Sequence, residues 1–220
     1  MVARKPRVAE PLALDRIVEQ AIAVADRDGL GGLSMRRLGG ELGADPMSIY
    51  HHVPGKDALL AAMVDRVVAG IRPAAEGEWA DALRATVLGA RAVMLRHPWA
   101  ARALEGRADP TPATIAYLDA VMGILRRGGL SLELVHHAIH LLGSRVLGFS
   151  QDLFDDSTDQ DPSPEQRAAQ AEAWASALPY VAELALAATH DGGLGGCDDD
   201  EEFAFALDVI IEGLARRASA

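Results

Sequence analysis

The sequence predicts an all-α fold, and three observations support this. Apolar residues recur at intervals of three and four along most of the chain, which is the spacing of amphipathic helices. Aromatic residues make up only 5% of the 220 residues while alanine is abundant, which favours helices over a sheet. Proline and glycine fall between the periodic segments, where such residues begin or end helices. We therefore expect helices throughout and no strands.

The composition excludes several classes of protein. No run of eighteen apolar residues is present, so we expect no membrane-spanning helix. The basic N-terminus is not followed by the apolar stretch of a signal peptide. Cys197 is the single cysteine, so no internal disulfide can form, which suits a reducing cytosol. These features predict a cytoplasmic protein.

The charge is distributed unevenly along the chain. The formal net charge is -11. Residues 1–56 carry eight Lys/Arg and seven Asp/Glu, whereas the rest carry thirteen and twenty-five. A nearly neutral head on a strongly acidic body can orient a molecule on a polyanion such as DNA.

The first elements are marked by local signals. Residues 1–11 look like a flexible basic arm. A helix is expected over about 14–28, closed by Gly29 in a left-handed conformation. Ser34 is a candidate N-cap for a helix over about 35–43, with Leu33 and Leu38 as its hydrophobic staple.

A second, shorter helix follows after a turn of three residues. Gly43 ends the preceding helix, and Asp45-Pro46 combines an Asp N-cap with proline at the first helical position. Pro54-Gly55 ends the new helix. Two helices joined by a short turn that contains glycine are the helix-turn-helix motif. Residues 46–52 are the expected recognition helix, held by the inward side chains Leu38, Leu42 and Ile49.

Beyond Pro54-Gly55 the chain is expected to continue as helices, over about 56–71, 78–96, 99–107, 112–127, 131–153, 164–190 and 202–218. The domain organisation predicted is an arm over 1–11, a helix-turn-helix domain over 12–55, and a ligand-binding and dimerisation domain over 56–220. The apolar helices 131–153 and 202–218 are the candidate dimer interface. Their apolar residues are Leu134, Ala138, Leu141, Leu142 and Leu147, and Phe203, Phe205, Leu207, Ile210, Ile211 and Leu214.

The head resembles the DNA-binding region of TetR-family regulators. The shared pattern is Tyr50-x-His52-Val53, a turn, and Lys56-Asp57-x-Leu59-Leu60, at a fixed distance from Arg36-Arg37-Leu38. More loosely, Gly129-Leu130-Ser131 and the final helix from Phe203 to Leu214 look like the C-terminal domain of the tetracycline-repressor subfamily. This resemblance implies a homodimer, paired as a four-helix bundle, on double-stranded DNA.

The resemblance also implies which residues touch DNA. They are Arg36, Pro46, Met47, Ser48, Tyr50, His51, His52 and Lys56. Their chemistry agrees, because an arginine can donate two hydrogen bonds to guanine and a lysine at a helix N-terminus attracts phosphate. We expect a repressor on a palindromic operator, released by a small-molecule effector. A transcriptional activator and a ligand-binding module without DNA binding remain as alternatives.

The effector region is predicted only as a set of residues, some of which are expected to be core. The set is Met63, Met94, His97, Trp99, Tyr117, His137, His140 and Phe149. Tetracycline is not expected, because residues 103–107 lack the metal-chelating histidine that the family's tetracycline binders carry there. The sequence does not identify the effector, the operator or the regulated genes.

Metal, cofactor and enzyme chemistry are not expected. His136 and His140 are four residues apart on one helix face, a spacing that can bind metal, but no third ligand is evident. The chain lacks the nucleophile elbow, the phosphate-binding loop, the zinc-protease motif and the dinucleotide-binding fingerprint. We therefore expect a regulator and not an enzyme.

Overall fold

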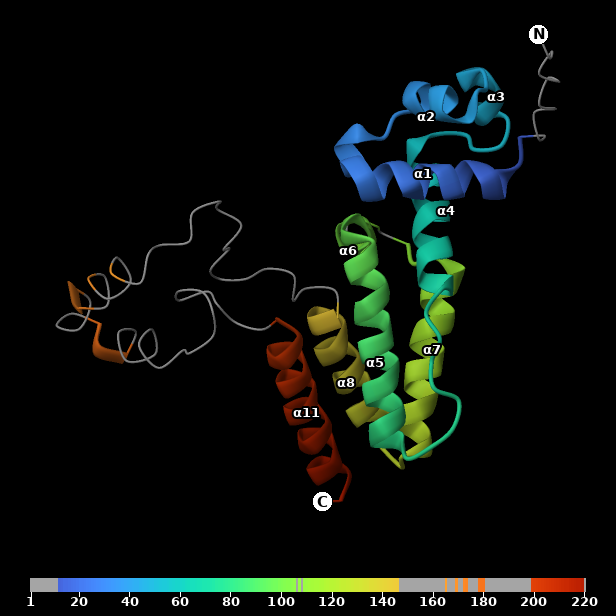
Figure 1. Ribbon diagram of the computed structural model, residues 1–220. Coiled ribbons are helices and arrows are strands. Elements are labelled where there is room, and N and C mark those ends of the chain that lie inside the picture. Colours follow the sequence, from blue (N-terminus) through green and yellow to red (C-terminus); the bar gives the residue numbers. More distant parts are fainter. Residues whose placement is uncertain are drawn as a thin grey trace, which may run out of the picture. The chain divides into compact units, whose positions relative to one another are not determined.

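The computed structural model describes residues 12–105, 107, 109–146, 165, 169, 172–173, 178–180 and 199–219, and all of its regular elements are helical (Figure 1). The chain forms two compact units, residues 1–128 and residues 129–220. Among the described residues, no helix combines the length and hydrophobicity needed to cross a bilayer. The predicted all-α fold is thus confirmed for the part of the chain that the structure describes.

Three helices form the head of the first unit. Helix α1 (Leu14–Asp28) buries Ile17, Ala21 and Val24 on one face, as its periodicity predicted. Gly29 donates its N–H to the carbonyl oxygen of Ala25 and ends the helix. Its φ of 68° is positive, as predicted, but its ψ of 172° is extended and not left-handed helical, because the chain passes at once into a 3₁₀ turn, η1 (Leu30–Gly32).

Helices α2 (Met35–Leu42) and α3 (Pro46–Tyr50) form the helix-turn-helix, and both begin at the predicted caps. Ser34 Oγ accepts a hydrogen bond from the N–H of Arg37 at 3.2 Å. Asp45 Oδ1 accepts one from the N–H of Met47 at 2.8 Å. Gly43 takes the left-handed conformation, with φ 64° and ψ 31°, which turns the chain between the two helices.

Four further helices complete the first unit: α4 (Lys56–Ala69), α5 (Trp79–Arg96), α6 (Pro98–Glu105) and α7 (Pro112–Arg127). In Figure 1, α1 crosses the upper end of α4, and α4 descends beside α7. Asp65 on α4 accepts a hydrogen bond at 2.8 Å from the N–H of Ala113 in the first turn of α7. Because α4 packs against both α1 and α7, the head and the bundle α4–α7 belong to one unit.

The second unit contains α8 (Leu132–Val146) and α11 (Asp199–Ala218), which pack against each other. Phe203, Leu207, Ile211 and Leu214 of α11 are buried, at the spacing of one helix face. Helix α11 begins three residues before the predicted start, within its acidic run, since carboxylates are favourable at a helix N-terminus. Most of the predicted helix 164–190, and residues 147–153, lie outside the described residues.

Candidate nucleic-acid interface

Helix α3 presents a short exposed surface on a fixed base. Ile49 is completely buried, and so is Leu38 of α2, so α3 is held against the rest of the head. Met47 is 65% exposed and Tyr50 is 43% exposed. His51 and His52 are also exposed, while Pro46 and Ser48 are half-buried. Ile49 is therefore inward, as predicted, and the predicted DNA contacts Met47, Tyr50, His51 and His52 are exposed, whereas Ser48 is only partly so.

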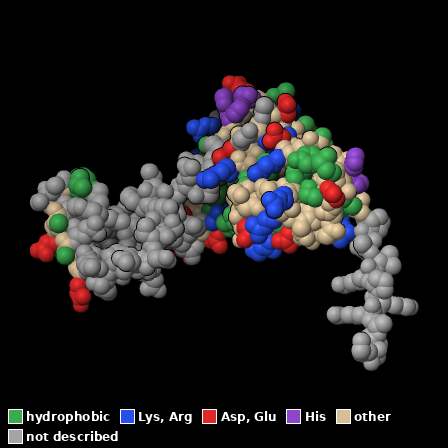
Figure 2. Space-filling model, turned by 90° about the horizontal axis from the view of Figure 1, so that it is seen from above, with side chains coloured by type: hydrophobic (Ala, Val, Ile, Leu, Met, Phe, Trp, Pro, Cys, Tyr) green, Lys and Arg blue, Asp and Glu red, His purple; other side chains and the backbone are tan. Residues whose placement is uncertain are grey.

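The predicted DNA contacts also include two cations from neighbouring helices. Arg36 is exposed in the first turn of α2. Lys56 is the exposed first residue of α4, and its Nζ lies 3.5 Å from the carbonyl oxygen of Leu30. Figure 2 looks down on the head, where a group of hydrophobic side chains lies beside basic side chains and a few acidic ones. This mixture suits contacts to both phosphates and base edges. The basic arm over 1–11 lies outside the described residues.

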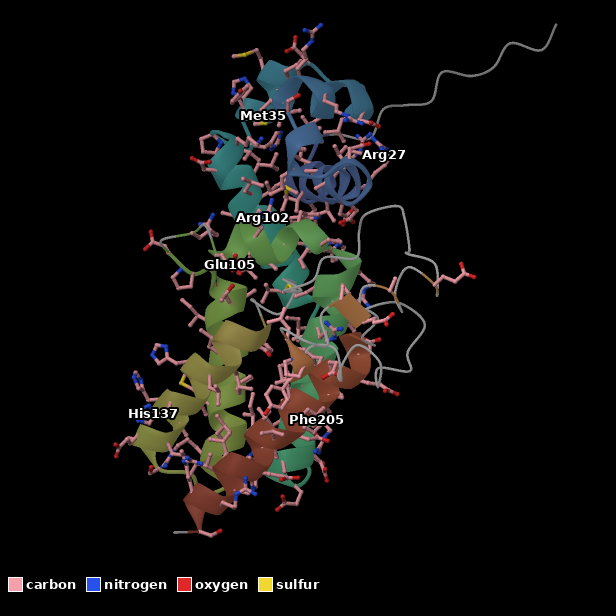
Figure 3. All side chains as sticks on the ribbon, turned by 90° about the vertical axis from the view of Figure 1, so that its left-hand side faces the viewer. Arg27, Met35, Arg102, Glu105, His137 and Phe205 are labelled. Atoms are coloured by element: carbon pink, nitrogen blue, oxygen red, sulfur yellow. The ribbon has the colours of Figure 1, made fainter. Side chains whose placement is uncertain are left out.

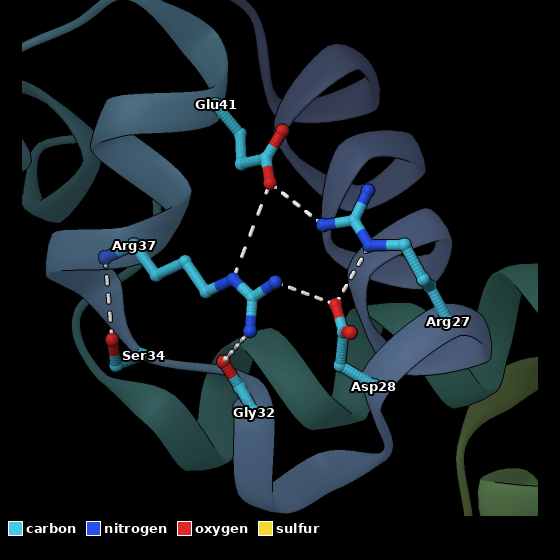
Figure 4. A network of polar contacts seen from close by, with 6 residues as sticks. All are labelled: Arg27, Asp28, Gly32, Ser34, Arg37 and Glu41. Atoms are coloured by element: carbon cyan, nitrogen blue, oxygen red, sulfur yellow. Dashed lines mark hydrogen bonds and ion pairs between the residues drawn. The ribbon is translucent and has the colours of Figure 1, made fainter.

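A network of charged side chains fixes α2 against the end of α1 (Figure 4). Asp28 Oδ2 accepts hydrogen bonds from Arg27 Nε at 2.7 Å and from Arg37 NH2 at 2.6 Å. Glu41 Oε1 accepts from Arg27 NH2 at 2.7 Å, and Arg37 NH1 donates to the carbonyl oxygen of Gly32 at 3.3 Å. The network distinguishes two adjacent arginines, because the half-buried Arg37 is engaged with Asp28 and Gly32 while Arg36 is exposed to solvent.

The network shifts the pKa values of Asp28 and Arg27. The hydrogen bond from Arg27, followed by the positive charges of Arg27 and Arg37, lowers the pKa of Asp28 below its ordinary value of 3.8. The hydrogen bonds to Asp28 and Glu41 raise the pKa of Arg27. Sequence analysis did not find this network, because Arg27 and Glu41 are fourteen residues apart and only the fold brings them together.

Acidic residues of α1 also contact the bundle below. Arg66 of α4 donates to Asp15, and its NH1 donates to Glu19 Oε1 at 3.1 Å. Asp26 Oδ1 accepts from His97 Nδ1 at 2.9 Å and from Trp99 Nε1 at 2.7 Å. Figure 3 shows Met35 and Arg27 on the head, with Arg102 and Glu105 on α6 beneath it.

The predicted effector residues fall in three environments. Met63, Met94 and Trp99 are buried in the first unit, and His97 is half-buried beside Trp99, with ring centroids 6.2 Å apart. Burial raises the pKa of Tyr117, on α7, from 10.0 to about 12. His137 and His140 are exposed on α8 in the second unit, and Phe149 lies outside the described residues. The donor groups of His97 and Trp99 are engaged with Asp26, so their role as effector contacts stays a prediction.

The exposed histidines of α8 lie close to one another. The rings of His136 and His140 are 4.6 Å apart between centroids, and those of His136 and His137 are 5.8 Å apart. Among the described residues, no group of three or more His, Cys, Asp or Glu side chains is placed to hold a metal ion.

The outer faces of α8 and α11 carry exposed apolar side chains. Leu132 and Leu141 of α8 are 73% and 42% exposed, and Phe205 and Val209 of α11 are 68% and 50% exposed. The labelled His137 and Phe205 mark these two helices in Figure 3. Leu132 and Val209 were missed by the sequence analysis, although Val209 follows Phe205 by the four residues that place two side chains on one helix face.

Comparison with known proteins agrees with this geometry. Residues 17–63 match the model of bacterial regulatory proteins of the tetR family, and residues 72–218 match that of the tetracyclin repressor-like C-terminal domain. The HTH-type transcriptional repressor DrrR1 of Streptomyces coeruleorubidus is 33% identical over 215 residues, covering 92% of this chain and 77% of that protein. The tetracycline repressor class E of Escherichia coli is 29% identical over 126 residues, covering 56% and 59%.

The fold agrees as well. The crystal structure of the Streptomyces coelicolor TetR family protein ActR in complex with actinorhodin superposes with a TM-score of 0.76 at 29% sequence identity. The match covers 96% of this chain and 100% of that one. The helix-turn-helix and both family models, which together span most of the sequence, support one conclusion. This chain belongs to the TetR family, and it is a ligand-responsive, DNA-binding transcriptional repressor.

Proposed function

We propose that two copies of this chain bind a palindromic operator in the cytosol, and that a small organic molecule bound in the body releases them. In this proposal residues 12–55 read DNA, and residues 56–220 bind the effector and dimerise. The observation that carries it is α3: a short helix anchored by the buried Ile49, with Met47 and Tyr50 projecting into solvent. A recognition helix must be exposed and rigidly held to enter the major groove.

Each proposed DNA contact has a chemical role. Arg36 donates two hydrogen bonds to a guanine or holds a phosphate. The hydroxyl groups of Ser48 and Tyr50 donate to phosphate oxygens, and Lys56 adds a positive charge at the N-terminus of α4. Pro46, Met47, His51 and His52 complete the surface that faces the groove.

The exposed apolar face of the second unit supports the dimer. Phe205 and Val209 lie one helical turn apart on α11, and Leu132 and Leu141 are exposed on α8. Large apolar side chains concentrated on two adjacent helices favour association with another surface. A second copy is the natural partner, because helix-turn-helix proteins read two half-sites about 34–36 Å apart.

Release requires that the effector discriminate between two conformations. An effector shifts the equilibrium only by the difference between its affinities for the DNA-bound and the DNA-free arrangement. We propose that it binds among the side chains of α4–α7 near Met94 and Tyr117. ActR, a structural relative, was crystallised with the small molecule actinorhodin.

The proposal is tested by selecting duplexes from a random pool with the purified protein, then measuring affinities by gel shift at several salt concentrations. We expect a palindromic site. Arg36→Ala should weaken binding by about 1–3 kcal/mol if it reads a guanine, and Lys56→Ala should reduce the salt slope by about one. Arg96→Ala, an exposed cation at the end of α5, is the matched control. Unchanged affinity in both head variants would contradict the contact assignment.

A further inference from the structure

One carboxylate oxygen of the head receives two donors from the bundle. Asp26 is near the end of α1, and its Oδ1 accepts hydrogen bonds from His97 Nδ1 and Trp99 Nε1 at 2.9 and 2.7 Å. His97 is the last residue before α6, and Trp99 lies in the first turn of α6. The contact therefore links residues 71 and 73 positions apart, one in the reading head and two at the junction of α5 and α6.

The donor of one of these hydrogen bonds is buried, whereas Asp26 lies at the surface of the head. The side chain of Trp99 is only 6% exposed, and an indole ring has a single donor and no acceptor. A buried donor that loses its acceptor bears the full cost of desolvation. Asp26 is ideally suited as that acceptor, because hydrogen bonds to an ionised carboxylate are stronger than those to a neutral oxygen.

Asp26 is also one member of an acidic stripe on α1. Asp15, Glu19 and Asp26 are spaced by four and seven residues, which places them on one face of the helix. Arg66 of α4 contacts the first two, and the α5–α6 junction contacts the third. The two residues that contact Arg66 lie eleven and seven residues before Asp26, or about 16 and 10 Å along the helix axis. The contacts with Arg66 and with the α5–α6 junction therefore reinforce, at two places, the packing of α1 on α4 and α6.

We propose that Asp26 is a positioning residue that fixes the orientation of the head through His97 and Trp99, and thereby sets the DNA affinity of the protein. The inference rests on the proposed DNA-reading function, because the orientation of each head determines whether two heads match the half-site spacing. A protein whose binding-competent orientation is only partly populated binds DNA more weakly by that fraction. The α5–α6 junction is thus one of the places where the bundle holds α1 through side-chain hydrogen bonds.

The first test compares the operator affinity of Asp26 variants. Asp26→Ala should weaken binding about fivefold or more, which is the lower range of coupling between sites. Asp26→Asn, which keeps an oxygen acceptor for both donors, should restore most of that affinity. Trp99→Phe should act in the same direction as Asp26→Ala, and the double variant should bind no more weakly than Asp26→Ala alone, since Asp26→Ala already removes the hydrogen bond that Trp99→Phe removes. Asp81→Ala, which removes a carboxylate paired with Arg84, is the control and should bind as wild type.

The second test does not depend on DNA. Spin labels at Gly40→Cys on α2 and Ala116→Cys on α7, in a Cys197→Ser background, report the distance from head to bundle. Both sites are exposed, and labelled chains are diluted with unlabelled protein so that distances within one chain are measured. We expect one narrow distribution for the otherwise unmodified chain and a broad or shifted one after Asp26→Ala or Trp99→Phe.

The outcomes distinguish failure of the positioning role of Asp26 from failure of the proposed DNA-reading function. Wild-type affinity and an unchanged distance distribution in Asp26→Ala and Trp99→Phe would overturn the positioning role of Asp26, and so would tighter DNA binding. A wild-type chain that selects no DNA would instead contradict the proposed function, and the distance measurement would still decide the role of Asp26. If Asp26→Ala does not fold, Trp99→Phe decides the question, because it removes the N–H group and keeps an aromatic ring.

Discussion

The head and the second unit differ in how far their large apolar side chains are buried. In the head, Leu33, Leu38 and Ile49 are buried, and the large apolar side chains exposed near the turn, Met47 and Tyr50, belong to the reading helix. In the second unit, both described long helices expose large apolar residues, including Leu132 and Phe205. The described residues of the first unit thus cover the apolar faces of the head, whereas among the described residues α8 and α11 keep large apolar side chains exposed.

This difference indicates that different interactions stabilise the two regions. The head is stabilised by caps and by the network of Arg27, Asp28, Arg37 and Glu41, all within thirty residues, so a single copy suffices. The second unit relies on apolar burial, which is not directional and is satisfied by any complementary surface. Substituting the charged and closely packed residues of the head, and the exposed apolar residues of the second unit, therefore tests this comparison.

The largest effect is expected from charging the outer face of α11. Phe205→Glu combined with Val209→Glu should produce a monomer, because two carboxylates cannot be buried without partners. Loss of the linked second half-site should weaken operator binding about 100-fold or more, while the head keeps its helical structure. Light scattering after gel filtration measures the mass. Arg217→Glu, exposed on another side of α11, should leave the dimer intact; a dimeric double variant would refute this assignment of the interface.

A smaller effect is expected from two adjacent glycines of α2. A Cβ at Gly39 would lie 2.9 Å from Ala44 O and 3.0 Å from Pro46 Cγ, whereas nothing lies within 4 Å of one at Gly40. Gly39→Ala should push α3 away, destabilise the protein by about 1–3 kcal/mol and weaken DNA binding. Gly40→Ala should stabilise it by about 0.5–1 kcal/mol, because glycine is unfavourable inside a helix. Equal shifts of the two melting temperatures would show that α3 does not depend on this close approach.

The smallest effect is expected from acid. The pKa of Asp28 is lower in the folded head than in the unfolded chain, mainly because Arg27 donates a hydrogen bond to it. Its contribution to stability is therefore complete above the unfolded pKa of 3.8 and is lost as the pH falls through the folded value. Asp28→Asn should remove this dependence from urea unfolding curves recorded below pH 4, with Asp119→Asn as the control for losing one exposed carboxylate. If the free energy of unfolding falls equally with decreasing pH in wild type and in Asp28→Asn, the network has no role in acid stability.

Much of the head was predictable because its signals are local. Ser34, Gly43 and Asp45-Pro46 each determine the conformation of a few neighbouring residues, and each acts in the structure as its position in the sequence indicated. The recognition helix and its outward side chains follow from these signals and from helical periodicity. The effector region was less accessible, because a set of scattered apolar and aromatic residues does not reveal which of them share an environment.

The sequence by itself determined the helices of the head, the caps of α2 and α3, and the family resemblance, since these depend on residues only a few positions apart. Only the tertiary structure decided that Arg37 pairs with Asp28, that Arg66 contacts Asp15 and Glu19, and that Asp26 accepts hydrogen bonds from both His97 and Trp99. These contacts join side chains nine to seventy-three residues apart, and no local pattern encodes them. They form because the packing of α1 on α2, α4 and α6 brings donors and carboxylates to the same place.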